Sequence, residues 1–218
     1  MLRTSPSRDR YDAGNRLNLP IVEGGRETLM QITWRDLVTI VHGMLFGGLF
    51  LMAGFGVLVL LHRWQSSGGG PEVTEAGRRR EHIFLVVMVV LGWGAVLSGA
   101  YFVYPWYRAI PPAGVTNLGA YPQRLLLSDP RTAGWHTLGM EWKEHVAWMA
   151  PILMTMVAWV LMKYEDAGEE HRRLRSTAVV FALVALLAAG VAAGFGALID
   201  KQAPVTGGPE INLMRGKR

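Results

Sequence analysis

Four long apolar stretches dominate this sequence, and each is long enough to cross a lipid bilayer as a helix. They cover residues 37–61, 83–104, 145–162 and 176–199, and none of them contains Asp, Glu, Lys or Arg. A helix needs about 20 mostly apolar residues to span a hydrocarbon core of roughly 30 Å. The sequence therefore predicts an all-α integral membrane protein, built as a four-helix bundle over 36–200.

Polar segments flank and separate the four stretches. Residues 1–35 form an N-terminal arm that we expect to be extended, and 201–218 form a C-terminal tail of the same character. The connection between the second and third stretches is too long for a simple turn, and connections of this length are usually functional. We expect it to fold back over one membrane face as a cap.

Basic residues gather at one end of the expected bundle. One group lies between the first two stretches and another between the last two: Arg63, Arg78, Arg79, Arg80, Lys163, Arg172, Arg173 and Arg175. Since cytoplasmic loops carry an excess of Lys and Arg, both connections are expected in the cytoplasm. The termini then lie outside, and we expect the inner membrane of a bacterium. The net charge of +5 fits lipid headgroups, and nucleic acid is not an expected partner.

Composition and motifs exclude several kinds of chemistry. The chain has no cysteine, which excludes iron–sulfur ligation and covalent c-type haem attachment. It has no P-loop, dinucleotide fingerprint, nucleophile elbow or zinc-protease motif. The absence of charge inside the stretches argues against an ion-coupled transporter. Whether the chain is an enzyme stays open, and an accessory or electron-transfer subunit is favoured.

His42 and His145 are the leading candidates for a site. His42 lies inside the first stretch and His145 begins the third, and these two helices run in the same direction. The two imidazoles are therefore expected at one membrane level, facing each other. This is an arrangement that holds a b-type haem, with both histidines as iron ligands. The alternative is that His42 makes a structural hydrogen bond and His145 is simply interfacial.

A second pair, His62 and His82, lies at the opposite membrane face and is a weaker candidate for a second haem. His62 follows His42 by 20 residues, which rotates it about 200° around the helix. The two histidines of the first helix thus point to opposite sides, which argues against two haems stacked in one core. Their charged neighbours, Arg63 and Glu81, are also those of ordinary interfacial histidines.

Residues 135–145 form the densest cluster of reactive side chains. Glu141 precedes His145 by four residues, so it shares a helix face with it and is expected to orient its imidazole. His136 lies on the other face, so one compact metal site is not expected. Glu141 could also accept a proton from a quinol, and the plain alternative is a charged interfacial turn in which Lys143 pairs with a glutamate.

Two steps of the form G-x-x-x-G occur, at Gly43 and Gly47 and at Gly190 and Gly194. Such steps allow helices to approach closely in lipid, so bundle packing is the plain interpretation. The sharper interpretation is that Gly43, next to His42, leaves room for a flat macrocycle.

The pattern of His42 with Gly43, His145, and more weakly His62 and His82, resembles that of small polytopic b-type cytochromes. The resemblance covers the four helices but neither the arm nor the long connection. It implies that the chain binds one haem b inside a respiratory or photosynthetic complex. Whether it binds a second haem stays open. It also implies electron transfer to other subunits, with a quinone as one candidate partner.

Two other functions stay open. The first is a cofactor-free scaffold subunit that uses its arm, tail and long connection to hold other subunits of a membrane complex. The second is an enzyme that acts on a lipid-soluble substrate through Glu141, Glu144 and His145. The presence or absence of a haem spectrum separates the first of these from the electron-transfer hypothesis.

Overall fold

The structure is a computed structural model, and it describes residues 31–66, 74–164 and 172–212. Most of the predicted arm, residues 1–30, lies outside the described residues, as do 67–73, 165–171 and 213–218. The described part is mostly helical, with one short pair of strands.

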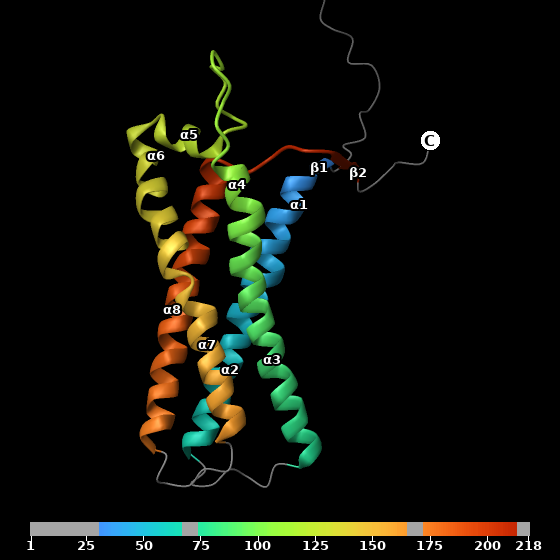
Figure 1. The fold of residues 1–218 in the computed structure, drawn as a ribbon, viewed down its shortest axis with the longest axis vertical. Coiled ribbons are helices and arrows are strands. Elements are labelled where there is room, and N and C mark those ends of the chain that lie inside the picture. Colours follow the sequence, from blue (N-terminus) through green and yellow to red (C-terminus); the bar gives the residue numbers. More distant parts are fainter. Residues whose placement is uncertain (1–30, 67–73, 165–171, 213–218) are drawn as a thin grey trace, which may run out of the picture.

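Four helices are long and apolar enough to cross a membrane, and we call them the four spans (Figure 1). The first span comprises α1 (Trp34–Ile40), η1 (Val41–Gly48) and α2 (Leu49–Ser66). The second comprises α3 (Glu75–Ser98), η2 (Gly99–Val103) and α4 (Tyr104–Tyr107). The third comprises α6 (Pro130–Gly134), η3 (Trp135–Met140), η4 (Trp142–Val146) and α7 (Met149–Lys163), and the fourth is α8 (Arg172–Gln202). Each contains its predicted stretch and extends beyond it.

The four spans pack side by side and alternate in direction (Figure 1). We call the end that carries α4, α5 and α6 the cap end, and the end that carries the two short connections the hairpin end. Close approaches at glycine fix the register of the first two spans. Phe50 lies against Gly92, and Phe84 lies against Gly56.

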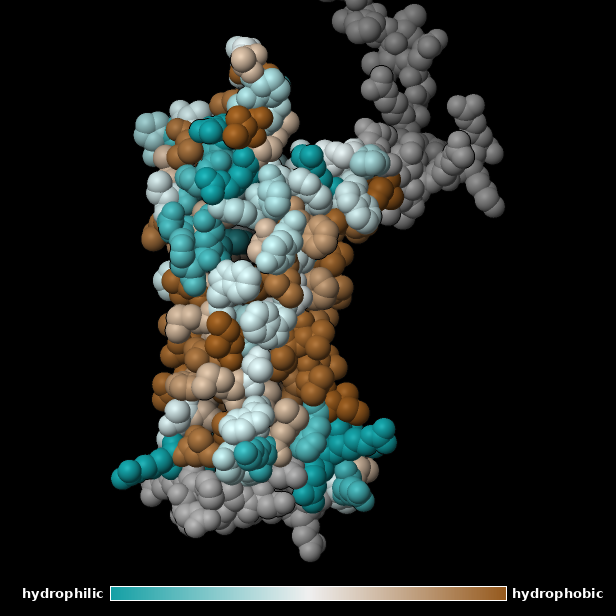
Figure 2. Space-filling model, in the orientation of Figure 1, coloured by the Kyte–Doolittle hydropathy of each residue, from teal (hydrophilic) through white to brown (hydrophobic). Residues whose placement is uncertain are grey.

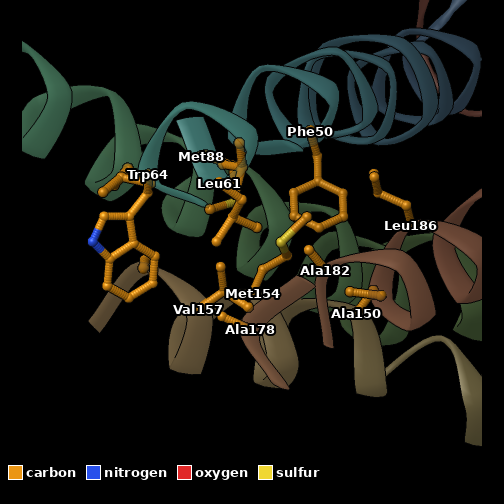
Figure 3. Close-up of a cluster of buried hydrophobic side chains, with 14 residues drawn as sticks. Phe50, Leu61, Trp64, Met88, Ala150, Met154, Val157, Ala178, Ala182 and Leu186 are labelled. Carbon is orange, nitrogen blue, oxygen red and sulfur yellow. The ribbon is translucent and has the colours of Figure 1, made fainter. Parts of the chain in front are cut away.

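The main core lies in the half of the spans nearer the hairpin end. It contains Phe50, Leu61, Met88, Met154 and Val157, all of them at most 2% exposed (Figure 3). Alanines of α8, at 178, 182 and 185, face this cluster and let α8 approach α2 and α7 closely. In lipid, small residues at a helix interface favour association because backbones can come together.

Apolar side chains also cover much of the outside of the spans. Figure 2 shows hydrophobic residues gathered between two hydrophilic ends. Large apolar side chains such as Met44, Met52, Val90 and Leu187 are at least 60% exposed. An apolar surface of this kind is expected where lipid replaces water as the solvent.

The connection between the second and third spans forms part of the predicted cap. Its helix α5 (Pro122–Leu127) buries Leu126 in a second core cluster. Around Leu126 this cluster gathers Tyr107, Met140, Ile199 and Val205, from four different segments. The stretch from Ala109 to Ala120 instead projects beyond the cap end (Figure 1).

A short antiparallel ladder joins the two ends of the described chain. Strand β1 (Gln31–Thr33) pairs with β2 (Glu210–Asn212) at the cap end. Thr33 also caps α1, because its hydroxyl accepts from the Asp36 amide at 3.2 Å while the Asp36 carboxylate accepts from the Thr33 amide at 2.7 Å. The polar segments next to the first and last spans therefore hold each other and the start of the first helix.

The cap-end half of the molecule departs from regular α-helix. The π-helical segments of the described residues are η1, η2, η3 and η4, and all of them lie in this half. The third span is also interrupted by a turn at Ala147 and Trp148. Pro151 lacks an amide hydrogen, and its ring crowds the carbonyl four residues earlier, at Ala147. The proline therefore accounts for the break.

Candidate functional site

The hydrogen bonds of His42 determine which ring nitrogen is free. Its Nδ1 lies 3.0 Å from Ser98 Oγ on α3, and that hydroxyl donates to the Ala95 carbonyl at 3.2 Å. Because the serine hydrogen is engaged, its oxygen accepts from His42 Nδ1–H. The imidazole is thereby fixed as the tautomer with a lone pair on Nε2, the form that binds metals.

Gly99 provides the surface against which this imidazole rests. A Cβ at Gly99 would lie 2.7 Å from His42 Cε1, closer than real contacts allow. Any larger residue at 99 would therefore push the ring away from Ser98. A glycine at this position is required by a close approach, which the sequence pattern alone did not indicate.

His145 lies at about the membrane level of His42, but it does not contact it. Trp93 Nε1 donates to Thr155 Oγ1 at 3.2 Å, and its ring lies 6.5 Å from that of Trp148. Both contacts join the second span to the third. Counting one to two turns from them toward the cap end reaches Ser98 on the second span and His145 on the third, so His145 lies level with Ser98, the partner of His42. The His145 side chain is 69% exposed and bonds to its own helix.

The hydrogen bonds of His145 resemble those of His42 in one respect. Its Nδ1 lies 3.0 Å from the Glu141 carbonyl oxygen and 3.4 Å from a Glu141 carboxylate oxygen. The expected contact between Glu141 and His145 is thus present. It also leaves His145 Nε2 without a hydrogen bond among the described residues, so the lone pair is again on Nε2.

Lys143, two residues earlier on η4, faces the interior of the spans. Its Nζ lies 2.8 Å from the place a Cβ would take at Gly196 of α8, and its charge is close enough to His42 to act on it. The alternative pairing of Lys143 with a glutamate is wrong for the described residues, where it forms no ion pair within 4 Å. Glu144 instead lies close to the Tyr104 hydroxyl.

A second polar group lies nearer the cap end and centres on His136. Its Nδ1 lies 2.8 Å from the Tyr107 hydroxyl, and its Nε2 lies 3.2 Å from the Gln123 side-chain amide. Tyr107 and Gln123 are buried at 2% and 7% exposure. This group ties α4, α5 and η3 together, so its evident role is to hold the cap on the spans.

His62 and His82 occupy the hairpin end, as expected. His62 is exposed at the end of α2, and His82 is half-buried in α3. Their neighbours Arg63 and Glu81 join the two helices by an ion pair of 3.5 Å. This places both histidines beside a charged interhelical contact, at the opposite end of the spans from His42.

In the part of the chain that the structure describes, the glycine steps do not pack against other helices. A Cβ at Gly43, Gly190 or Gly194 would meet no heavy atom within 4 Å, and at Gly47 only the backbone of its own helix comes near. The expectation that these steps pack the bundle is therefore wrong within the described residues. The open space at Gly43 is on the exposed outer surface of the first span, whereas the His42 ring lies against Gly99 of the second span.

The arrangement offers two nitrogen ligands rather than a cage of ligands. Within the described part of the chain, no three His, Asp or Glu side chains gather closely enough to hold a metal ion. Glu141 contacts His145, whereas Glu144 lies close to the Tyr104 hydroxyl, so these three side chains do not converge on one point. The sequence did not single out Ser98, Gly99, Tyr107 and Gln123. Each of them takes part in a site only through a contact with a residue distant in sequence.

Comparison with known proteins gives no further assignment. The chain matches no protein family, no curated protein and no solved structure.

Proposed function

We propose that this chain is an electron-transfer subunit of a membrane complex, a four-helix bundle that holds a b-type haem on His42 in its cap-end half. The observation that carries this proposal is the chain of hydrogen bonds from His42 Nδ1 through Ser98 to Ala95. It presents Nε2 as a fixed lone pair inside a span, and an iron porphyrin is a membrane cofactor that needs such a ligand. The bound group would supply one-electron transfer.

Two glycines shape the surroundings of His42. Gly99 lets the imidazole lie against the second span, and Gly43, one residue after the histidine, leaves the outer surface of the first span open. The helix around His42 is π-helical from Val41 to Gly48. Departures from α-helix of this kind occur frequently at functional sites, because they redirect a side chain that regular geometry would bury elsewhere.

We assign His145 as the second iron ligand. Its level and its free Nε2 support this role, while its exposure means that η4 has to turn for the two rings to share one iron. The turn at Ala147 and Trp148 separates η4 from α7. Trp142 Nε1 on η4 donates to the Ala188 carbonyl of α8 at 3.1 Å, so such a turn breaks this contact but leaves the main core intact.

The test is the visible spectrum of the chain purified from a host supplied with haem. Reduced-minus-oxidised spectra of the wild type are compared with His42→Ala and His145→Ala, with His62→Ala as the control from the hairpin end. We expect an alpha band in the wild type and the His62 variant, and its loss in both cap-end variants. A folded wild type without a Soret band rules the proposal out, and loss in the His62 variant moves the haem to the other face.

A second candidate function is a scaffold subunit without a cofactor, and the glycines of α8 favour it. Gly190 and Gly194 have open space where a neighbouring helix would pack, and both are exposed on the apolar surface. Small residues four apart are a common docking face for a helix in lipid. If the purified chain is colourless and Gly190→Leu releases it from its complex, the scaffold function replaces the haem proposal.

A further inference from the structure

An open groove at the hairpin end carries two arginines next to the apolar surface of the spans. It has a volume of about 470 Å³, and its described lining is Glu75, Ala76, Arg78, Arg79 and His82, all of them on α3. The apolar stretch of the second span begins directly after these residues. The groove therefore lies at the depth where lipid headgroups meet a membrane protein.

Arg79 is the exposed arginine of this groove. In the part of the chain that the structure describes, its guanidinium forms no hydrogen bond and no ion pair within 4 Å, whereas Glu81 is paired with Arg63 at 3.5 Å. Glu75 is the one carboxylate in the described lining, and it lies one turn before Arg79, away from the apolar stretch. An anion at the membrane boundary therefore meets Arg79 before it meets Glu75.

An exposed apolar stripe continues from Arg79 along the same face of α3. This helix is regular here, so Ile83, Val86 and Val90 lie within about 40° of Arg79 around its axis. Their side chains are 54%, 50% and 60% exposed. The distance along the helix from Arg79 to Val90 is about 16 Å, which is close to half of a hydrocarbon core of roughly 30 Å. One face of α3 thus offers a cationic end and an apolar stripe as deep as one lipid leaflet.

We propose that this face of α3 binds an anionic phospholipid, with its phosphate on Arg79 beside Arg78 and an acyl chain along the apolar stripe. Guanidinium groups bind phosphate through paired, charge-assisted hydrogen bonds. Figure 2 shows hydrophilic residues directly next to the hydrophobic surface at the hairpin end, where such a headgroup would lie. The site is at the opposite end of the spans from His42, so it stands or falls independently of the proposed function.

The experiment is native mass spectrometry of the full-length protein in detergent, which counts the lipids bound to each molecule. The protein is titrated with phosphatidylglycerol and with phosphatidylcholine of the same acyl chains, in which choline cancels the phosphate charge. The variants are Arg79→Gln and Arg79→Lys. The matched control is Arg80→Gln, because Arg80 is also exposed but lies about 100° further around α3 and does not line the groove.

Wild type should bind its first phosphatidylglycerol about tenfold to thirtyfold more tightly than phosphatidylcholine, since each of the two arginines contributes about fivefold near a membrane surface. Arg79→Gln should weaken the first phosphatidylglycerol by about fivefold and leave phosphatidylcholine unchanged. Arg79→Lys should keep most of the preference. Arg80→Gln should change it by less than about twofold, because a solvent-exposed charge away from the phosphate is screened.

Two further measurements locate the lipid and identify its source. A phosphatidylglycerol with a photoreactive diazirine in the middle of one acyl chain should label residues 83–90 in the wild type, and should label them less in Arg79→Gln. Glycerol phosphate, which has the phosphate but no acyl chain, should not displace the bound lipid at millimolar concentration.

Four results overturn the inference. Equal affinity of the wild type for the two lipids rejects an anionic site. Equal losses in Arg79→Gln and Arg80→Gln mean a general attraction to the basic end, and labelling outside residues 83–90 places the lipid elsewhere. Displacement by glycerol phosphate identifies a soluble phosphate as the ligand. Circular dichroism of each variant shows that a loss of binding is not a loss of helix.

Discussion

At the scale of single residues, two glycines near His42 should respond in opposite ways to the same change. Gly99→Ala puts a Cβ 2.7 Å from His42 Cε1, and overpacking of this kind costs about 1–3 kcal/mol. Gly43→Ala meets nothing within 4 Å, so its free energy of unfolding should stay the same or rise by up to about 1 kcal/mol from helix propensity. Unfolding of the apoprotein in mixed detergent micelles measures the free energy of unfolding of both variants. Equal destabilisation of the two variants would contradict the close packing of His42 on α3.

Arg175 is a second residue whose effect follows from its contacts. It is 5% exposed at the hairpin end, donates from Nη1 to the Trp64 carbonyl at 3.1 Å, and stacks on the Trp64 ring at 4.9 Å. Arg175→Ala should lower the free energy of unfolding by about 2–3 kcal/mol, because it breaks a buried charged hydrogen bond between the first and fourth spans. The exposed Arg173→Ala is the matched control and should change it by less than about 0.5 kcal/mol. Similar losses in both variants would point to a general effect of charge at this end.

The sequence predicted that His42 and His145 face each other, but in the structure the His145 side chain is exposed and does not face His42. Spacing predicts direction only where a helix keeps 100° per residue, and η4 does not. In the structure Lys143 faces the interior, and His145 is exposed. Ser98 could not be predicted as the partner of His42, because that contact depends on the register between two spans.

At the scale of elements, the cap depends on the buried contact between Tyr107 and His136. Tyr107→Phe removes the 2.8 Å hydrogen bond and leaves His136 Nδ1 without its partner, a loss of about 1–2 kcal/mol. Amides of α5 and of its C-cap, such as those of Leu125 and Ser128, should then exchange hydrogen faster, while amides of α7 keep their protection. The exposed Tyr101→Phe should change neither. Unchanged exchange in α5 would show that the Leu126 cluster alone holds the cap.

The four spans were predictable because the bilayer is a demanding solvent. A chain segment in hydrocarbon must satisfy its own backbone, so length and apolarity alone indicate a helix. Pro151 is likewise a sequence signal for the break in the third span, since a proline interrupts the hydrogen bonds of a helix. The π-helical segments and the pairing of β1 with β2 were not predictable, since they depend on packing and on contacts between residues nearly 180 positions apart.

At the scale of the whole molecule, the charge distribution predicts how the protein lies in the membrane. The hairpin end carries Arg63, Arg78, Arg79, Arg80, Lys163, Arg172, Arg173 and Arg175, which should keep it in the cytoplasm. The cap end would then face outward. A haem on His42, in the cap-end half, would exchange electrons with partners on that outer side.

The absence of cysteine allows a clean test of this orientation. Thr116→Cys places one thiol on the exposed loop beyond the cap end, and Gln65→Cys places one on the exposed hairpin end. A membrane-impermeant maleimide added to intact spheroplasts should label Thr116→Cys, and should label Gln65→Cys only after the membrane is opened. The reverse pattern would mean that Arg35, Arg108, Arg124 and Arg131 outweigh the hairpin-end cluster. The proposed haem would then serve cytoplasmic partners instead, because its position relative to the cap does not change.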